Sequence, residues 1–258
     1  MINIGLITAK QAKLRPNAWA VYDQTSNKRI TFSELDDLVK KIANGLLGLG
    51  LEKGDRVSIL SQNTIEFLAL FFACGRVGLV AHALNWRLGS DELAQIIENG
   101  QPKVIITQGQ FSKTTHDLHK KINFIDHWLE YGTDSNSSFE TLIDKASSNE
   151  PIIHSSIGDE DPFFILYTGG TTGISKGALH THKSAYFGML NQTVAERIVP
   201  SDVYMLTGQM FHIPVLLAMN YTSHGCPIVL MNFDAELALN LIQEERVSGF
   251  LGITTMLN

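Results

Sequence analysis

The chain is poor in cysteine and has no long hydrophobic run. Cys74 and Cys226 are its two cysteines, and each lies within an apolar stretch. Two separated thiols provide neither a disulfide framework nor a cysteine zinc site, which is typical of a reducing compartment. The longest apolar run, Phe67 to Cys74, is far too short to span a bilayer. We therefore expect a cytoplasmic protein without a transmembrane segment.

An excess of positive charge is also absent. The sequence has 20 Lys and Arg against 26 Asp and Glu, a formal net charge of −6, which argues against nucleic acid as a partner. The segment from Met1 to Lys13 lacks the basic flank, apolar core and small-residue cleavage site of a secretory signal. With 258 residues, 44% of them hydrophobic, the chain can form one large domain or two small ones.

The clearest secondary-structure signal follows Thr31. Thr31 and Glu34 have the spacing of a capping box, so a helix is expected to begin there. Apolar residues then recur at three- and four-residue spacing as far as Leu47, and Gly50 stands where a left-handed cap is needed. Because Gly45, Gly48 and Gly50 lie in and after a helix, they do not form a dinucleotide fingerprint.

Strand-like and helix-like segments alternate along the chain. Strands are expected at 18–22, 56–60, 78–84, 103–107, 163–168, 178–182, 203–207, 228–231 and 249–253. Helices are expected at 63–77 with Asn63 as the N-cap, and at 90–99, 139–146, 184–197, 214–223 and 235–246. This alternation predicts an α/β fold with mostly parallel sheets and helices on both faces. The polar region 131–162 is the expected place for a subdomain boundary.

One segment carries chemistry: Phe164-Ile-Leu-Tyr-Thr168-Gly-Gly-Thr-Thr-Gly173-Ile-Ser-Lys176-Gly177. Its glycines allow backbone amides to turn inward around an anion, its threonines add hydroxyl donors, and its lysine adds a mobile positive charge. A merely flexible hairpin would not require so many hydroxyls or the lysine. The pattern therefore predicts a polyphosphate site formed by Thr168, Gly169, Gly170, Thr171, Thr172, Gly173 and Lys176. It is not a Walker loop, because the Gly-Lys-Ser/Thr spacing is missing and a strand is expected next.

Tyr-Thr-Gly-Gly-Thr-Thr-Gly-x-x-Lys-Gly resembles the signature of the adenylate-forming superfamily: acyl-CoA synthetases, peptide-synthetase adenylation domains and luciferases. The family commonly has serine where Gly169 stands, and the glycine variant resembles fatty acyl-CoA ligases. It commonly has proline where Ser175 stands, and the loss of this proline is expected to make the loop less stiff. Two other prolines of the family are replaced by Gln209 and Thr254. Further segments in the family's order are Thr31 to Leu35, Gly54 to Val57, Asp91 to Leu93, Met210 to His212, Gly225 to Leu230 and Leu251 to Met256.

The resemblance implies part of the large N-terminal domain of such an enzyme. A carboxylate would attack the α-phosphate of Mg-ATP to give an acyl-adenylate and pyrophosphate, and a thiol, usually coenzyme A, would then displace AMP. Lys176 and His212 become the candidate catalytic residues: Lys176 on the β- and γ-phosphates, His212 near the carboxylate of the acid or in the pocket wall. An isolated histidine in apolar company is more often a core residue, so the role of His212 rests on the resemblance. Fatty, aryl and small acids all stay open.

The resemblance also implies that much machinery follows Asn258: the adenine pocket, the magnesium-binding glutamate, the ribose-binding aspartate, the hinge and the C-terminal domain with its lysine. We therefore expect residues 1–258 to be an incomplete N-terminal domain that folds, activates no acid and self-associates through apolar surface. ATP, Mg²⁺ and coenzyme A would belong to the full-length enzyme.

Two other readings remain open from the residues. Gly173-Ile-Ser175-Lys-Gly177 matches the nucleophile elbow of a serine hydrolase, although an elbow needs its serine directly between a strand and a helix. A non-catalytic nucleotide-binding module is the other alternative. His180 and His182 share one face of an expected strand and resemble a metal pair, but no third ligand has matching spacing, so structural roles are expected.

Overall fold

A computed structural model of the protein describes residues 2–133, 137–168 and 175–257. Within these ranges the strands form two sheets. Sheet A has the order β11-β9-β10-β1-β2 and sheet B the order β6-β5-β3-β4-β7-β8. Neighbouring strands are parallel except for β1 with β2 and β7 with β8. The strands are β1 (Trp19–Asp23), β2 (Lys28–Thr31), β3 (Arg56–Leu60), β4 (Val80–Leu84), β5 (Val104–Gln108), β6 (His127–Tyr131), β7 (Pro162–Thr168), β8 (Lys176–Thr181), β9 (Tyr204–Leu206), β10 (Ile228–Leu230) and β11 (Gly249–Phe250).

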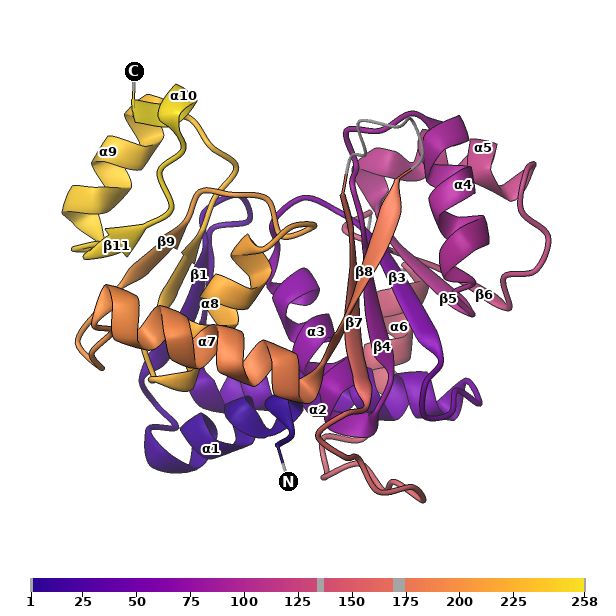
Figure 1. Ribbon diagram of the computed structural model, residues 1–258, viewed down its shortest axis with the longest axis horizontal. Helices are drawn as coiled ribbons and strands as arrows, with labels where there is room; N and C mark the ends of the chain where they lie inside the picture. Colours follow the sequence, from indigo (N-terminus) through magenta and orange to yellow (C-terminus); the bar gives the residue numbers. More distant parts are fainter. Residues whose placement is uncertain (1, 134–136, 169–174, 258) are drawn as a thin grey trace.

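The helices connect these strands and form three layers around the two sheets (Figure 1). They are η1 (Ile4–Leu6), α1 (Ile7–Leu14), α2 (Phe32–Gly48), α3 (Ile65–Val77), α4 (Ser90–Gly100), η2 (Gly109–Phe111), α5 (Ser112–His119), α6 (Ser138–Lys145), α7 (His182–Glu196), α8 (Pro214–Ser223), α9 (Ala235–Glu244) and α10 (Thr254–Leu257). Helices α2, α3 and α8 pack between the sheets, α4 and α5 cover the outer face of sheet B, and α9 covers the outer face of sheet A. The expected α/β fold with helices on both faces is confirmed.

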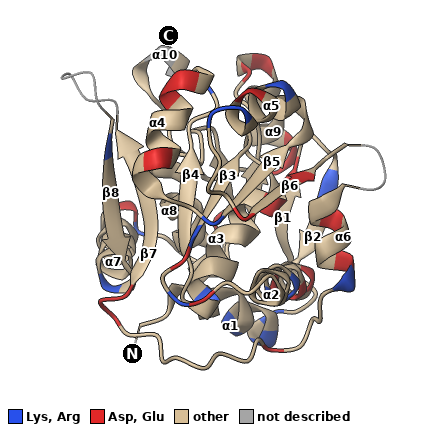
Figure 2. Ribbon diagram, turned by 90° about the vertical axis from the view of Figure 1, so that its right-hand side faces the viewer, with Lys and Arg blue, Asp and Glu red and all other residues tan. Residues whose placement is uncertain are grey.

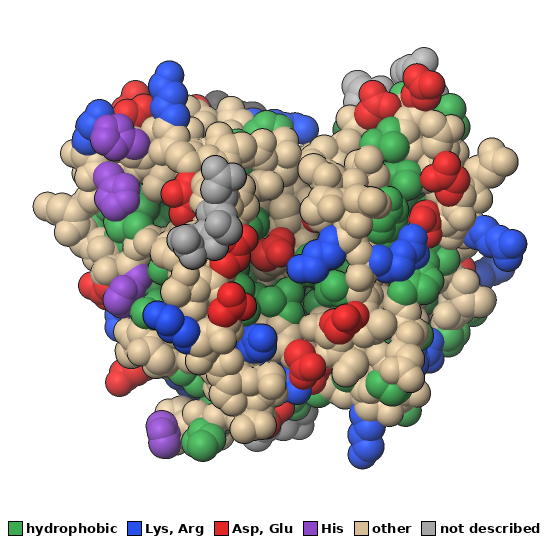
Figure 3. Space-filling view, turned by 180° about the vertical axis from the view of Figure 1, so that it is seen from behind, with side chains coloured by type: hydrophobic (Ala, Val, Ile, Leu, Met, Phe, Trp, Pro, Cys, Tyr) green, Lys and Arg blue, Asp and Glu red, His purple; other side chains and the backbone are tan. Residues whose placement is uncertain are grey.

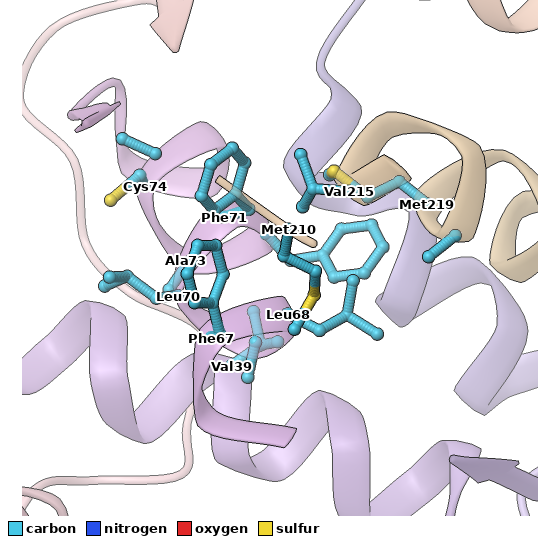
Figure 4. Packing of buried hydrophobic residues seen from close by; sticks show 14 of the residues in the cluster. Val39, Phe67, Leu68, Leu70, Phe71, Ala73, Cys74, Met210, Val215 and Met219 are labelled. Carbon is cyan, nitrogen blue, oxygen red and sulfur yellow. The ribbon is translucent and has the colours of Figure 1, made fainter. Parts of the chain in front are cut away.

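Helix α3 forms the centre of the largest core. From Ile65 to Val77 every residue except Glu66 is buried, because this helix faces apolar groups on several sides. Figure 4 shows its side chains, including Phe67 and Phe71, beside Val39 of α2 and the cluster of Met210, Val215 and Met219 at and before α8. A helix buried on all sides must be apolar around its whole circumference, and the sequence of α3 meets that requirement.

The capping box at the start of α2 is confirmed. The Glu34 amide donates to Thr31 Oγ1 at 3.2 Å, the Thr31 amide donates to Glu34 Oε2 at 2.7 Å, and Gly50 has a φ of +83° after the helix ends. The prediction that Asn63 caps α3 is wrong. Thr64 is the cap, its hydroxyl accepting from the Phe67 amide at 3.2 Å, because the Asn63 side chain points to another part of the chain.

Boundaries also differ at the second half of sheet B. Strand β8 begins at Lys176, two residues earlier than expected, because it pairs with β7 up to Thr168. His182, expected on the strand, begins α7, since Thr181 caps that helix through its hydroxyl, which accepts from the Ser184 amide at 3.1 Å. Helix α1 and strands β2 and β6 were not expected from the sequence.

Both sheets combine strands from before and after the polar region 131–162. Sheet A joins β1 and β2 to β9, β10 and β11, and sheet B joins β7 and β8 to four earlier strands. Whether a subdomain boundary lies in this region stays a prediction. In sheet B the central strands β4 and β7 carry no charged residue, whereas charges gather on helices and loops (Figure 2).

Candidate functional site

A cleft of about 750 Å³ lies between the two sheets, at the edge where their parallel strands end. Segments after β3 and β4 of sheet B form one side, and segments after β9, β10 and β11 of sheet A form the other. The space-filling view from behind shows a notch between two lobes at the upper edge of the molecule (Figure 3). The residues that line the cleft are Gln62, Asn85, Trp86, Arg87, Thr207, Gly208, Gln209, Phe211, His212, Pro214, Asn232, Phe233, Leu251, Ile253 and Met256. Ligands of open α/β sheets bind at such carboxyl ends.

Asn63 ties the two sides of the cleft together. Its side-chain amide donates to the carbonyl oxygens of Gly208 at 2.9 Å and Met231 at 3.1 Å, and its Oδ1 accepts from the Met210 amide at 2.9 Å. The side chain is buried and uses its hydrogen-bonding groups on backbone that follows β9 and β10. Asn63 therefore positions the loop that carries Phe211 and His212.

The wall on the sheet B side is aromatic and polar. The Trp86 indole donates to Gln209 Oε1 at 3.0 Å, and its ring lies edge to face with Phe211 at a centroid distance of 6.4 Å. The guanidinium of Arg87 lies 5.2 Å from the ring centre of Trp86 and 5.9 Å from that of Phe211. The hydrogen bond to Gln209 holds Trp86 in the cleft lining, and Arg87 lies beside the rings of Trp86 and Phe211.

His212 lies in the cleft lining, between Phe211 and the start of α8. Its ring centre is 4.9 Å from that of Phe211. Burial, and then the positive charge of Arg87, lower the pKa of His212 below its ordinary value. At neutral pH the imidazole is therefore uncharged and acts as a hydrogen-bonding group with one donor and one acceptor nitrogen.

The predicted polyphosphate segment joins β7 to β8. Thr168, the last residue of β7, pairs with Lys176, the first residue of β8, and both are exposed. Since β7 runs parallel to β4, this hairpin end lies at the edge of sheet B where β4 ends. Two neighbouring strands were expected here and are present. Gly169, Gly170, Thr171, Thr172 and Gly173 lie outside the described residues.

The serine-hydrolase alternative is not supported. Ser175 directly precedes β8, and β8 is antiparallel to β7, so the serine lies between two strands of a hairpin. A nucleophile elbow requires a turn from strand to helix. The Gly-x-Ser-x-Gly match is a coincidence of composition in a glycine-rich segment.

His180 and His182 both pack against phenylalanine rings of β7. His180 stacks on Phe164 at 4.5 Å, and His182 stacks on Phe163 at 5.0 Å while its Nδ1 accepts from the Ile4 amide. Burial lowers the pKa of His182 to about 4. Among the described residues, no group of three or more His, Cys, Asp or Glu side chains could hold a metal ion.

No described helix is both long and apolar enough to cross a lipid bilayer.

Sequence reasoning missed most of the cleft. Trp86, Arg87, Asn232 and Phe233 belong to no motif and come together only when strands from two sheets end side by side. Their position immediately after expected parallel strands is the signal that would have found them.

Three curated relatives cover the chain along most of its length. It is 30% identical over 252 residues to the long-chain-fatty-acid–CoA ligase FadD13 of Mycobacterium tuberculosis, covering 96% of this chain and 49% of the relative. It is 28% identical to a feruloyl-CoA synthase of an Amycolatopsis species, covering 98% and 49%. It is 30% identical to 4-coumarate–CoA ligase 3 of Arabidopsis thaliana, covering 87% and 41%. The chain thus spans about half the length of the curated relatives it matches.

Solved structures share the fold. The inhibitor-bound N-terminal domain of FACL13 from Mycobacterium tuberculosis superposes with a TM-score of 0.93 at 29% identity, covering 100% of this chain and 64% of that chain. ATP-bound MatB from Rhodopseudomonas palustris gives a TM-score of 0.83 at 26% identity, covering 99% and 50%. The family model described as AMP-binding enzyme matches residues 8–258, so the chain belongs to the AMP-binding enzyme family.

Proposed function

We propose that the full-length protein is an AMP-forming acid–thiol ligase. It would activate a carboxylic acid with ATP to an acyl-adenylate, releasing pyrophosphate, and transfer the acyl group to coenzyme A with release of AMP. The observation that carries the proposal is the hairpin whose ends, Thr168 and Lys176, face each other at the edge of sheet B where the parallel strands end. The relatives named as CoA ligases support the second step.

The residues of the site would act mainly through position and charge. Thr168 and Lys176, with the glycines and threonines between them, would hold the β- and γ-phosphates of ATP. Lys176 is exposed and appears in no ion pair of the described chain, which leaves its ammonium available for phosphate oxygens. Neutralising charge on a leaving pyrophosphate is the kind of stabilisation that contributes most to such reactions.

The acid would occupy the cleft. Its lining includes Phe211, Phe233, Leu251 and Ile253, which suit an acid with an apolar body. His212, uncharged at neutral pH, would lie beside the carboxylate or in the pocket wall. Relatives are named for a long-chain fatty acid, for feruloyl-CoA and for 4-coumarate. The proposal therefore covers the apolar character of the acid and does not name the acid. Because no cluster of three or more His, Cys, Asp or Glu side chains in the described residues could hold a metal ion, none of these residues is assigned to Mg²⁺.

The test is acid-dependent pyrophosphate exchange by the full-length protein across a panel of fatty, aryl and small acids. Lys176→Ala should slow the exchange roughly a hundred- to a thousand-fold, as the loss of a charge-stabilising group commonly does. Lys183→Ala is the matched control, because Lys183 lies on the adjoining helix and its ammonium is paired with Glu160 at 2.6 Å. An unchanged rate in Lys176→Ala would remove this lysine from the site.

That residues 1–258 activate no acid by themselves stays a prediction. Pyrophosphate exchange by the purified 258-residue chain would contradict it. ATP binding without exchange would instead favour the nucleotide-binding module for this chain.

A further inference from the structure

The charge of the cleft lining differs from that of the whole protein. The sequence has more acidic than basic residues, 26 against 20. Among the described residues that line the cleft there is no Asp, Glu or Lys, and Arg87 is the one side chain with a full charge. An ionised guanidinium in a partly enclosed space attracts anions and disfavours cations.

Arg87 has no anionic partner within the described part of the chain. Other arginines do: Arg76 pairs with Asp36 at 2.6 Å, and Arg29 pairs with Glu245 at 2.7 Å. Arg87 is instead exposed and lines the cleft, with its guanidinium beside the rings of Trp86 and Phe211. Its hydrogen-bond donors remain available to a ligand.

The backbone at Arg87 is also ordered before any ligand binds. Its backbone amide donates to Asn85 Oδ1 at 3.0 Å, and the Leu88 amide donates to the Asn85 carbonyl at 3.1 Å, which forms a tight turn after β4. Trp86, fixed by Gln209, supplies the ring on which the guanidinium rests. An arginine stacked in this way loses less conformational freedom when it binds a carboxylate or phosphate.

We propose that Arg87 is the anion anchor of the cleft and binds an oxygen of a carboxylate or phosphate group through its guanidinium. The inference rests on the proposed function, since that function brings both kinds of anion to this edge of the sheets. Planar, forked guanidinium donors match both groups. His212 beside it is uncharged, so Arg87 supplies the positive charge of this lining.

The test uses the 258-residue chain labelled with ¹⁵N. Three probes are titrated separately: ATP, inorganic pyrophosphate and octanoate. The indole N–H signal of Trp86, identified by its loss in Trp86→Phe, reports binding in the cleft. Arg87→Gln should weaken binding of at least one probe about tenfold or more, as expected for the loss of a charge-assisted hydrogen bond. Arg87→Lys, which keeps the charge but loses the planar fork, should recover part of the affinity.

Arg29→Gln is the matched control, because Arg29 also lies over two aromatic rings, Trp19 and Tyr22, but is paired with Glu245. It should leave all affinities unchanged. Weakening for ATP and pyrophosphate assigns Arg87 to phosphate, and weakening for octanoate alone assigns it to the acid. Equal affinities of wild type and Arg87→Gln, or no binding of any probe to the wild type, would overturn the inference. Failure of the proposed function is distinct: it appears as absence of pyrophosphate exchange in the full-length protein, whatever Arg87 binds.

Discussion

The Asn63 side chain connects the two sides of the cleft through three hydrogen bonds. Asn63→Ala would leave the carbonyls of Gly208 and Met231 and the amide of Met210 without their partner. Since each unsatisfied buried polar group costs roughly 1–3 kcal/mol and three are left, we expect the free energy of unfolding to fall by about 3 kcal/mol or more in urea denaturation.

Asn44→Ala is the control for this prediction. Asn44 also donates to two backbone carbonyls, those of Ser147 and Asn149, but at the surface, where water replaces it. We expect a loss below about 1 kcal/mol. Equal losses in the two variants would mean that Asn63 does not tie the cleft together.

His82 is a buried histidine that no functional motif includes. Its Nδ1 is 2.8 Å from Ser58 Oγ on the neighbouring strand, and its ring lies 5.2 Å from that of Tyr167. Burial, and then the charge of Arg56, lower the pKa of His82 to about 3. The folded chain therefore keeps this imidazole neutral at pH values where the unfolded chain protonates it.

Stability should consequently fall as the pH drops below about 6.5, the ordinary histidine pKa. Between that value and about 3 the unfolded state binds one more proton at this site, so His82 contributes a slope of up to about 1.4 kcal/mol per pH unit. Denaturation between pH 5 and 6.5 should show a shallower pH dependence in His82→Gln than in wild type. Ser58→Ala, which leaves the imidazole buried, should retain the slope. An identical slope in His82→Gln would show that His82 does not control it.

For individual residues, sequence motifs identified some positions of interest but not their tertiary contacts. Thr168, Lys176 and His212 were singled out from their motifs, and the roles assigned to them stay predictions. Asn63 was taken for a helix cap because Asn at that position commonly caps helices. Its actual partners lie about 145 to 168 residues away in the chain, beyond the reach of any local pattern.

Among the elements, α2 and α3 are clamped by one buried arginine. Arg76 of α3 pairs with Asp36 of α2 at 2.6 Å, and it also pairs with Glu150 of the segment that follows α6. The Thr8 hydroxyl of α1 donates to the same Asp36 carboxylate at 2.8 Å. Four separate segments are therefore joined through one guanidinium and one carboxylate.

Arg76→Met should destabilise the chain by about 3 kcal/mol, because the buried Asp36 carboxylate loses the closer of its two cationic partners and keeps only Lys40 at 3.4 Å. Thermal or urea denaturation measures the loss. The matched variant is Lys183→Met, which breaks the exposed Lys183–Glu160 pair and should cost less than about 1 kcal/mol. A loss in Arg76→Met as small as in Lys183→Met would show that the clamp adds no stability.

The elements that sequence patterns predicted are the long or strongly apolar ones. The capping box and the apolar stripe predict helix α2, and a short apolar run predicts β3. Strands β2 and β6 have no clear strand pattern of their own: β2 has one apolar residue, Ile30, and β6 lacks a strict alternation of apolar and polar residues. Each becomes a strand by pairing, β2 with β1 and β6 with β5. Pairing across the sheet is tertiary information.

On the scale of the whole molecule, an apolar surface remains on α7 and β8. Phe187 and Leu190 are 49% and 43% exposed, Val194 is 72% exposed, and Leu179 of β8 is 56% exposed. Phe187, Leu190 and Val194 recur at three- and four-residue spacing and so share one face of α7, and exposed apolar surface of this kind promotes association in water. We predict that residues 1–258 form dimers or larger species at micromolar concentration in sedimentation velocity.

The double variant Leu190→Glu, Val194→Glu should shift this chain toward the monomer, because charge on this face opposes apolar contact. Gln192→Glu on the same helix adds charge beside a polar network and should leave the association state unchanged. A monomeric wild type, or association that survives the double variant, would remove α7 as the cause.

The sequence by itself determined the α/β class, most of the helices and the hydroxyl-rich and glycine-rich segment, because these depend on periodicity, capping and local composition. Only the tertiary structure decided that Arg87 and His212 face one cleft, since they follow strands of different sheets. It also decided that Ser175 lies in a hairpin between antiparallel strands, because strand direction depends on pairing with partners far away in the chain. Burial and charge at a site arise from segments that meet in space, so no single stretch of sequence contains them.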